Sequence, residues 1–204
     1  MLHRTLFKEP NVMVATQSTM EELGSKAPEF NLPGLDGNLV SLDTFSQSKG
    51  YLVMFICNHC PFVVHVAQTL SRVCKEFQDK GVAVLAINSN DVDKYPADHP
   101  DKMKIFAEQY SLSFPYLFDE SQEVAKAYKA ACTPDFFLFD ANRKLVYRGQ
   151  LDASRPGNSE ANDGKDLKTA VNALLEGSEP LKEQTPSIGC NIKWRPGNEP
   201  DYFG

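Results

Sequence analysis

The feature that most constrains the fold is an abrupt change of hydrophobic period near residue 60. Residues 51–56, "YLVMFI", form a continuous apolar run, which is typical of a strand buried on both faces. From residue 61 to residue 80 the apolar side chains recur every three or four positions, which indicates an amphipathic helix. A buried strand that passes directly into such a helix predicts an α/β fold.

The rest of the chain continues this alternation of strands and helices. A second apolar run, "VAVLAIN", predicts another buried strand, and "DFFLFD" followed by "KLVYRGQL" predicts a hairpin. Three further segments have helical patterns, at residues 101–110, 121–130 (with Ser121 as the cap) and 165–177. "FPYLFD" predicts a short strand between the first two of these. The order predicts a central mixed β-sheet flanked by helices.

The domain organisation is expected to be one domain with two extensions. Residues 1–25 are interpreted as a loose leader without a signal peptide, and residues 26–176 as the domain. The domain begins with an N-terminal hairpin, "APEFNLPGLDGNLVSL". Residues 177–204 are Pro/Gly-rich and are interpreted as a tail packed on the domain.

Charge and cysteine content exclude several classes of protein. The net charge of -6 argues against nucleic acid as a partner, because phosphate binding needs a basic surface. No run approaches the roughly 20 apolar residues that a membrane span needs. Five cysteines are an odd number, so a closed disulfide framework is not expected. We therefore expect a cytoplasmic protein with mostly reduced thiols.

The segment between the first strand and its helix is Cys57-Asn58-His59-Cys60. If Asn58 is the N-cap, the unpaired N–H groups and the positive end of the helix dipole point at Cys57 and lower its pKa. His59 is expected to lower that pKa further. The pattern predicts a redox-active dithiol in which Cys57 is the nucleophile and Cys60 resolves the mixed disulfide.

Two other uses of the paired cysteines, haem attachment and a structural zinc site, fit the sequence less well. Haem attachment needs a histidine directly after the second cysteine, and Pro61 stands there. A structural zinc site normally needs four ligands, and although Cys57, Cys60 and either His59 or His65 could supply three, the chain has no second Cys-x-x-Cys pair. We expect no metal and no cofactor.

Three ordered motifs resemble the thioredoxin superfamily. They are "APEFNLPGLDGNLVSL", the "CNHC" between strand and helix, and "CTPDFFLFD" before the hairpin, which together cover about residues 26–176. The sequence is most similar to the redoxin branch, which includes the alkyl hydroperoxide reductase/thiol-specific antioxidant proteins. "CNHCPFV", "RGQLDASRPGN" and "PSIGCNIKW" also resemble a group of bacterial thioredoxin-like proteins.

The resemblance implies a thioredoxin-like fold and thiol–disulfide exchange. It implies a protein substrate that bears a thiol or disulfide, and an external electron donor. It also implies a cis Thr133–Pro134 bond facing the dithiol, with Thr133 and Asn58 on the edge where a partner's extended chain docks. The chain departs from thioredoxins in having Ile56, not tryptophan, before the first cysteine.

Two alternative functions remain open. A thiol peroxidase of the same fold carries Pro-x-x-x-Thr-x-x-Cys, and neither Cys57 nor Cys60 fits that spacing, although Cys60 is followed by proline as in Val-Cys-Pro. Antioxidant activity through slow reaction with peroxide is compatible with a reactive thiolate. A non-catalytic binding module is the other alternative, and the intact pair of thiols argues against it.

The three remaining cysteines have different prospects. Cys74 lies about 21 Å along the helix from Cys60, beyond the roughly 7 Å that a disulfide allows, and is expected to be buried. Cys132 precedes Pro134 by two residues and is expected near the dithiol. Cys190 lies in the apolar segment "SIGCNIKW" and could return to the site as an extra resolving thiol. Core packing and a redox role stay open for both.

Overall fold

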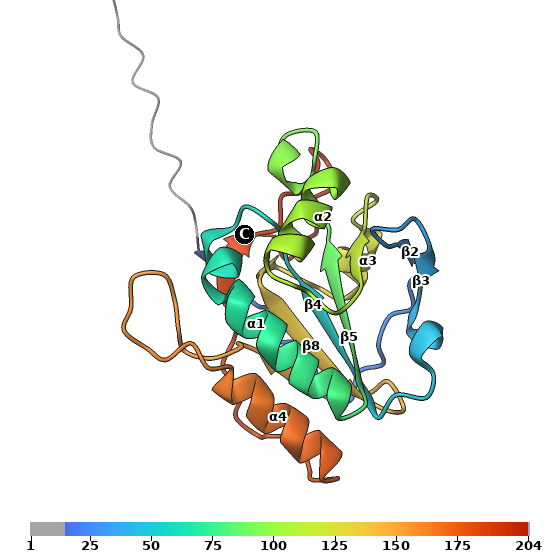
Figure 1. The fold of residues 1–204 in the computed structure, drawn as a ribbon, viewed down its shortest axis with the longest axis vertical. Coiled ribbons are helices and arrows are strands. Elements are labelled where there is room, and N and C mark those ends of the chain that lie inside the picture. The colour runs from blue at the N-terminus through green and yellow to red at the C-terminus, as the bar shows by residue number, and fades with distance from the viewer. Residues whose placement is uncertain (1–14, 204) are drawn as a thin grey trace, which may run out of the picture.

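The computed structural model describes residues 15–203, and its centre is a five-stranded mixed sheet of order β6-β5-β4-β8-β9 (Figure 1). Strands β4, β5 and β6 run parallel, and β8 and β9 are antiparallel to their neighbours. The bounds are β4 Gly50–Phe55, β5 Val82–Asn88, β6 Tyr116–Phe118, β8 Asp135–Asp140 and β9 Leu145–Gly149. The expected α/β architecture with a central mixed sheet is confirmed.

Four α-helices accompany this sheet in the described part of the chain. They are α1 Pro61–Asp79, α2 Pro100–Gln109, α3 Glu123–Ala127 and α4 Lys165–Leu175. The third is shorter than the expected helix over residues 121–130, and its N-cap is Gln122 with a φ of 66°, not Ser121. No helix within residues 15–203 combines the length and apolarity that a membrane crossing requires.

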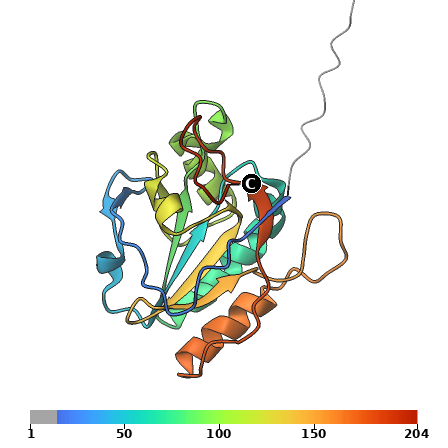
Figure 2. The ribbon, with the colours of Figure 1, turned by 180° about the vertical axis from the view of Figure 1, so that it is seen from behind.

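The sheet separates two hydrophobic cores because its strand side chains alternate between the faces. Helices α1 and α4 cover one face, where their side chains pack against Leu52 and Met54 of β4 (Figure 1). Residues of α3 cover the other face, where they pack against Val53 and Phe55 (Figure 2). All six residues of β4 are buried, as the continuous apolar run predicted.

Two small sheets complete the fold. The expected N-terminal hairpin is present as β2 Leu32–Pro33 and β3 Leu39–Val40. A three-stranded antiparallel sheet has the order β1-β10-β7 and joins β1 Ala15–Gln17 and β10 Ile188–Asn191 to β7 Cys132–Thr133 (Figure 2). Two 3-10 turns, η1 Leu42–Phe45 and η2 Pro96–Asp98, lie in the connections.

The β1-β10-β7 sheet changes the interpretation of both ends of the chain. Residues 15–17 belong to the segment expected as a loose leader, but they form strand β1, which pairs with β10. Residues 1–14 of that leader lie outside the described residues. In the tail, β10 is paired on both sides, and Ile192 and Trp194 are buried in the core on the α3 face.

Candidate active site

The dithiol lies where β4 ends and α1 begins, at the carboxyl end of the central parallel strand. The N-cap of α1 is Cys60, and Pro61 is the first helical residue, where its fixed φ suits the helix and its missing N–H is not needed. The expectation of Asn58 as N-cap is therefore wrong by two residues. The unpaired N–H groups of the first turn lie beside Cys60 rather than Cys57.

The sulfur atoms of three cysteines gather at this junction. Cys57 Sγ lies 3.3 Å from Thr133 Oγ1, and Cys60 Sγ lies 3.2 Å from the Thr133 carbonyl oxygen. Cys60 Sγ also lies 2.6 Å from Cys190 Sγ, which β10 supplies. The Thr133–Pro134 bond is cis, as the resemblance implied. The structure thus brings together the dithiol, the residue before the cis proline, and one of the two additional cysteines.

The electrostatics of the cysteines differ from the expectation. Burial raises the pKa of Cys57 well above its ordinary value, and the hydrogen bond to Cys60 raises it further. Hydrogen bonds from Cys190 and then Cys57 lower the pKa of Cys60. The prediction of a depressed Cys57 pKa is therefore wrong for this closed arrangement. The direction of these shifts makes Cys60 the more acidic thiol of the pair, and in its protonated form its S–H donates to the Thr133 carbonyl oxygen.

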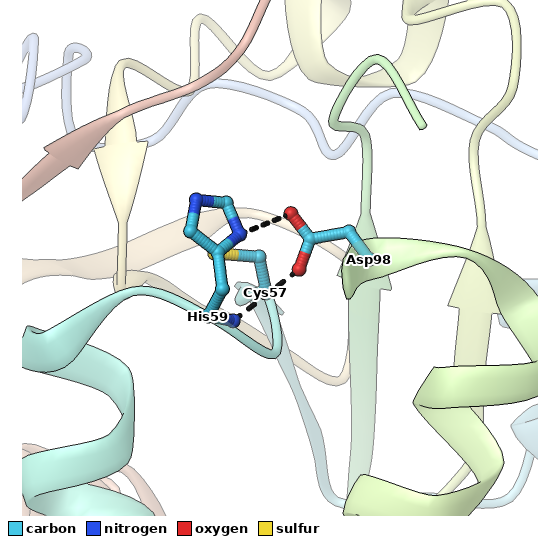
Figure 3. A group of neighbouring side chains, drawn as sticks. All are labelled: Cys57, His59 and Asp98. Carbon is cyan, nitrogen blue, oxygen red and sulfur yellow. Dashed lines mark hydrogen bonds and ion pairs between the residues drawn. The ribbon is translucent and has the colours of Figure 1, made fainter. Parts of the chain in front are cut away.

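An aspartate that sequence reasoning missed holds His59. The Asp98 carboxylate is fully buried and lies 2.6 Å from His59 Nδ1 (Figure 3). This hydrogen bond is the largest cause that raises the pKa of His59, which favours the protonated form of the ring. The His59 ring also stacks on Tyr95, with 5.6 Å between ring centroids. His59 is therefore held beside Cys57 by two separate contacts.

The Asp98 carboxylate also fixes the backbone of the Cys-x-x-Cys segment. Its Oδ1 accepts from the backbone N–H groups of Asn58 at 2.8 Å and His59 at 3.3 Å. Its Oδ2 accepts from Asn90 Nδ2 at 2.7 Å in addition to the His59 ring. Residues 90–101 are rich in acidic side chains, a composition typical of a solvated loop, but Asp98 within them is fully buried. The sequence marks this position only by the Asp-His-Pro at the start of α2, which does not indicate which residue Asp98 contacts.

Cys57, His59 and Asp98 form a cluster of potential metal ligands. One ligand atom each from Cys57, His59 and Asp98 lies within 4.8 Å of the other two. However, both Asp98 oxygens already accept two protein hydrogen bonds each, which uses the four lone-pair sites of a carboxylate. His65, the other histidine considered for zinc, instead lies 2.7 Å from Ser154 Oγ. The geometry fits a hydrogen-bonded histidine–aspartate pair beside a thiol.

The predicted docking edge is already occupied. The Thr133 backbone pairs with Cys190 of β10, so the chain's own tail lies where a partner strand was expected. Asn58 is also engaged within the molecule, because its Nδ2 donates to the Ala97 carbonyl and its Oδ1 accepts from Tyr116. The docking role of Thr133 and Asn58 stays a prediction, and the sequence carried no signal that β10 would pair with the Thr133 backbone.

Neither of the other two cysteines hydrogen-bonds to the dithiol among residues 15–203, although burial and then the charges of Asp135 and Cys60 raise the pKa of Cys132. Cys132 precedes Thr133 on β7, and since neighbouring side chains on a strand point to opposite faces, its sulfur points away from the dithiol. Its Sγ lies 3.6 Å from the Pro134 carbonyl oxygen. Cys74 is fully buried on α1, where burial raises the pKa of its thiol.

Comparison with known proteins identifies the family. The profile of the AhpC/TSA family matches residues 23–148. The chain belongs to the AhpC/TSA family. This match covers the hairpin β2-β3, the dithiol and the central sheet, and it confirms the resemblance to the redoxin branch of the thioredoxin superfamily.

Three proteins illustrate how similar this chain is to known proteins and over what length. The crystal structure of an uncharacterized conserved protein from Geobacillus kaustophilus is 52% identical, with a TM-score of 0.88 over 91% of this chain and 98% of that one. The thiol-disulfide oxidoreductase ResA of Bacillus thuringiensis subsp. konkukian (strain 97-27) is 27% identical over 131 residues, 64% of this chain and 71% of that protein. A putative peroxiredoxin of Mycobacterium tuberculosis is 30% identical over 115 residues, 56% of this chain and 68% of that protein.

Proposed function

We propose that this AhpC/TSA family member is a thiol–disulfide oxidoreductase that uses Cys57 and Cys60 as its dithiol. The observation that carries the proposal is the placement of both sulfurs against Thr133, beside a cis proline and at the N-terminus of α1. The ResA relatives support the reaction class. The substrate proposed is a protein that bears a disulfide or thiol, with an external electron donor.

The reaction begins with proton transfer between the two cysteines. Cys60 is the more acidic thiol of the pair, so once Cys60 is ionised it takes the proton of the Cys57 thiol as Cys57 attacks the partner disulfide. A Cys57–partner bond forms, and one partner sulfur leaves as a thiolate. Cys60 then attacks Cys57 Sγ, its proton passes to the second departing sulfur, and the protein keeps a Cys57–Cys60 disulfide.

His59 is proposed to stabilise the attacking sulfur, and Asp98, whose own charge raises the pKa of Cys57, is proposed only to position His59. The raised pKa of His59 favours a positive charge beside Cys57 as a negative charge develops there. Asp98 fixes both the ring and the backbone of residues 58 and 59, so the charge does not depend on a mobile side chain. Neither residue forms a covalent bond in this scheme.

Access to the dithiol requires local opening. Cys57 is 1% exposed and Cys60 is 0% exposed, so a protein disulfide cannot reach either sulfur in this conformation. We expect β10 to be the element that moves away from the dithiol, because it is short, pairs with Thr133 and contacts Cys60 through Cys190. Short strands with few hydrogen bonds open at lower free energy than the core of a sheet.

The proposal is tested by disulfide turnover of a labelled peptide disulfide with dithiothreitol as reductant. Cys57→Ser is expected to lower the rate at least about a hundredfold, because the attacking sulfur is gone. Cys60→Ser is expected to accumulate a mixed disulfide between Cys57 and the peptide, seen by intact-mass spectrometry. Cys74→Ala removes a buried thiol away from the site and serves as the control. Normal turnover by Cys57→Ser contradicts the proposal.

A thiol peroxidase is the second candidate, favoured by the family and by the Mycobacterium tuberculosis relative. Peroxidase chemistry is helped by a cation that steadies the departing oxygen. Four arginines follow the cis proline, and all of them contact other groups: Arg143 binds Glu29, Arg148 binds Gln184, Arg155 binds Gln150 and Arg195 pairs with Glu120. A rate with hydrogen peroxide no faster than that of a free thiol of matched pKa leaves exchange as the function, whereas a rate many orders of magnitude faster overturns it.

A further inference from the structure

The tail delivers a third cysteine to the dithiol. In the register of the small sheet, Cys190 of β10 lies directly opposite Thr133 of β7. Its sulfur lies 2.6 Å from Cys60 Sγ, although the two residues are 130 positions apart. We propose that Cys190 is a third redox cysteine, which takes Cys60 into a Cys60–Cys190 disulfide and returns Cys57 as a thiol. This inference rests on the proposed function and extends its reaction cycle.

The sheet register explains why Cys190 serves this role and Cys132 does not. Residues directly opposite each other in an antiparallel pair project to the same face. Cys190 therefore shares the dithiol face with Thr133, whereas the pair Cys132 and Asn191 projects to the other face. The choice between the two additional cysteines is thus set by one-residue alternation along two short strands.

A glycine holds β10 close to the docking edge. A Cβ atom on Gly189 would lie 1.9 Å from the Thr133 carbonyl oxygen, a distance that no side chain tolerates. Only glycine at this position lets β10 approach closely enough to place Cys190 on Cys60. The close approach is therefore encoded one residue before the cysteine that it positions.

The proposed step exchanges one disulfide for another inside the protein. After a partner has been reduced, Cys57 and Cys60 form a disulfide. The Cys190 thiolate attacks Cys60 Sγ, a Cys60–Cys190 bond forms, and the Cys57–Cys60 bond breaks. The electron pair leaves with Cys57 Sγ, which takes up the proton that Cys190 lost. No net electron is gained or lost, so no further oxidant is needed.

The charges around Cys190 suit its ionisation at that stage. In the reduced protein the hydrogen bond to Cys60 is the largest cause that raises the pKa of Cys190. In a Cys57–Cys60 disulfide the Cys60 sulfur carries no charge, so this cause disappears. Lys193 lowers the pKa of Cys190, and its Nζ lies over the Tyr95 ring that stacks on His59. Cys190 therefore becomes a better nucleophile once the dithiol is oxidised.

A Cys60–Cys190 bond has a consequence for partner binding. It ties β10 covalently to the start of α1 while β10 remains paired with Thr133. The docking edge is then closed until a reductant cleaves the bond. The oxidised protein is thereby protected from forming further mixed disulfides at Cys60, while the Cys57 thiol is regenerated.

The test is disulfide mapping of the full-length protein after oxidation by glutathione disulfide, with alkylation of the remaining thiols and mass spectrometry of non-reduced peptides. The wild type is expected to give a peptide that links Cys60 to Cys190. Cys57→Ser is expected to give the same link, because two thiols at 2.6 Å remain. Cys190→Ser and Cys190→Ala are expected to give only Cys57–Cys60, and Cys132→Ala is the matched control that retains the Cys60–Cys190 link.

Two outcomes separate this inference from the proposed function. If the wild type gives only Cys57–Cys60 and Cys57→Ser gives no internal disulfide, the third redox cysteine is excluded, while peptide-disulfide turnover continues to support exchange. If Cys57→Ser turns over normally, the proposed function fails, although mapping still reports whether Cys60 and Cys190 pair. Circular dichroism of each variant shows that the readout comes from a folded protein.

Discussion

The five-stranded sheet and the three-stranded β1-β10-β7 sheet meet at the dithiol, and they are built in opposite ways. The large sheet uses strands of up to seven residues that are almost entirely buried, such as β5. The small sheet uses strands of two to four residues drawn from both ends of the described chain and from the residues before Pro134. One side of the site, which we call the core wall, is therefore part of the buried core around the large sheet. The other side, which we call the cover, is the β1-β10-β7 sheet.

This difference assigns separate tasks to the two walls. The core wall holds Cys57, His59 and Asp98 in fixed geometry through buried hydrogen bonds. The cover carries Cys190 and closes the Thr133 edge through few backbone hydrogen bonds. Because local opening is easiest where buried contacts are few, access to the sulfurs is expected to depend on the cover and overall stability on the core wall.

The largest expected effect concerns Asp135, which joins the two sheets. Asp135 begins β8 and accepts a hydrogen bond from Ser18, directly after β1, at 2.7 Å. Burial raises its pKa from 3.8 to about 7. The folded state therefore retains a proton that the unfolded state loses, so this stability is fully present below about pH 4 and is lost as the pH rises through about 7. The shift corresponds to on the order of 4 kcal/mol.

Asp135→Asn keeps an acceptor for the Ala131 N–H and removes the titration. Between pH 4 and pH 8 the free energy of unfolding of the wild type is expected to fall by up to about 4 kcal/mol more than that of the variant. Denaturant unfolding at a series of pH values measures the difference, since all other groups contribute equally to both proteins. Parallel profiles would show that Asp135 does not link the sheets through a buried carboxyl.

The next largest expected effect is on the rate of thiol alkylation, and two glycine substitutions, one in the cover and one in the core, test it. Gly189→Ala places a methyl group on the Thr133 carbonyl, so β10 must shift away from β7. Overpacking of this kind costs about 1–3 kcal/mol, and each 1.4 kcal/mol is tenfold in an equilibrium. Alkylation of the reduced dithiol by iodoacetamide is expected to accelerate about 10- to 100-fold, with little loss of helix content.

Gly50→Ala is the matched control in the core. A Cβ there would lie 2.6 Å from a Leu174 methyl group and 2.8 Å from the Phe139 carbonyl oxygen. This variant is expected to lose about 1–3 kcal/mol of global stability, because β4 is the central strand, without a selective gain in thiol alkylation. Equal alkylation rates in the two glycine variants would mean that the cover opens only when the whole molecule unfolds.

The smallest expected effect is on the charge of the core wall. Asp98→Asn replaces a carboxylate that His59 Nδ1 contacts at 2.6 Å. The pKa of His59 is expected to fall toward its ordinary value, because the hydrogen bond to Asp98 is the largest cause that raises it. The His59 ring signal in an NMR titration measures the fall, and His65, which contacts Ser154, is the internal reference. An unchanged His59 titration would remove Asp98 from the proposed tuning of Cys57.

The sequence was sufficient wherever a structural feature is local. The change of period near residue 60 predicted β4, the turn with Cys57 and Cys60, and α1, because a buried strand and an amphipathic helix each show their pattern within a dozen residues. The N-cap was misplaced by two residues, since Asn58 is a good capping residue by type but turns its side chain to Ala97 and Tyr116.

Contacts between distant segments had no comparable signal. Asp98 lies 40 residues from Asn58 and was hidden in an acidic run that resembles a solvated loop. The prediction that the pKa of Cys57 is lowered was also wrong. Burial raises the pKa of Cys57, and a hydrogen bond with Cys190 lowers that of Cys60, and the helix dipole argument includes neither effect.

The sequence by itself therefore determined the fold class and the position of the dithiol between β4 and α1. Only the tertiary structure decided what pairs with the Thr133 backbone, which extra cysteine reaches the dithiol, and which of the two thiols is the more acidic. The physical reason is that periodicity and capping act within one segment, whereas the pairing of β10 with β7 brings together Cys60 and Cys190 across 130 residues.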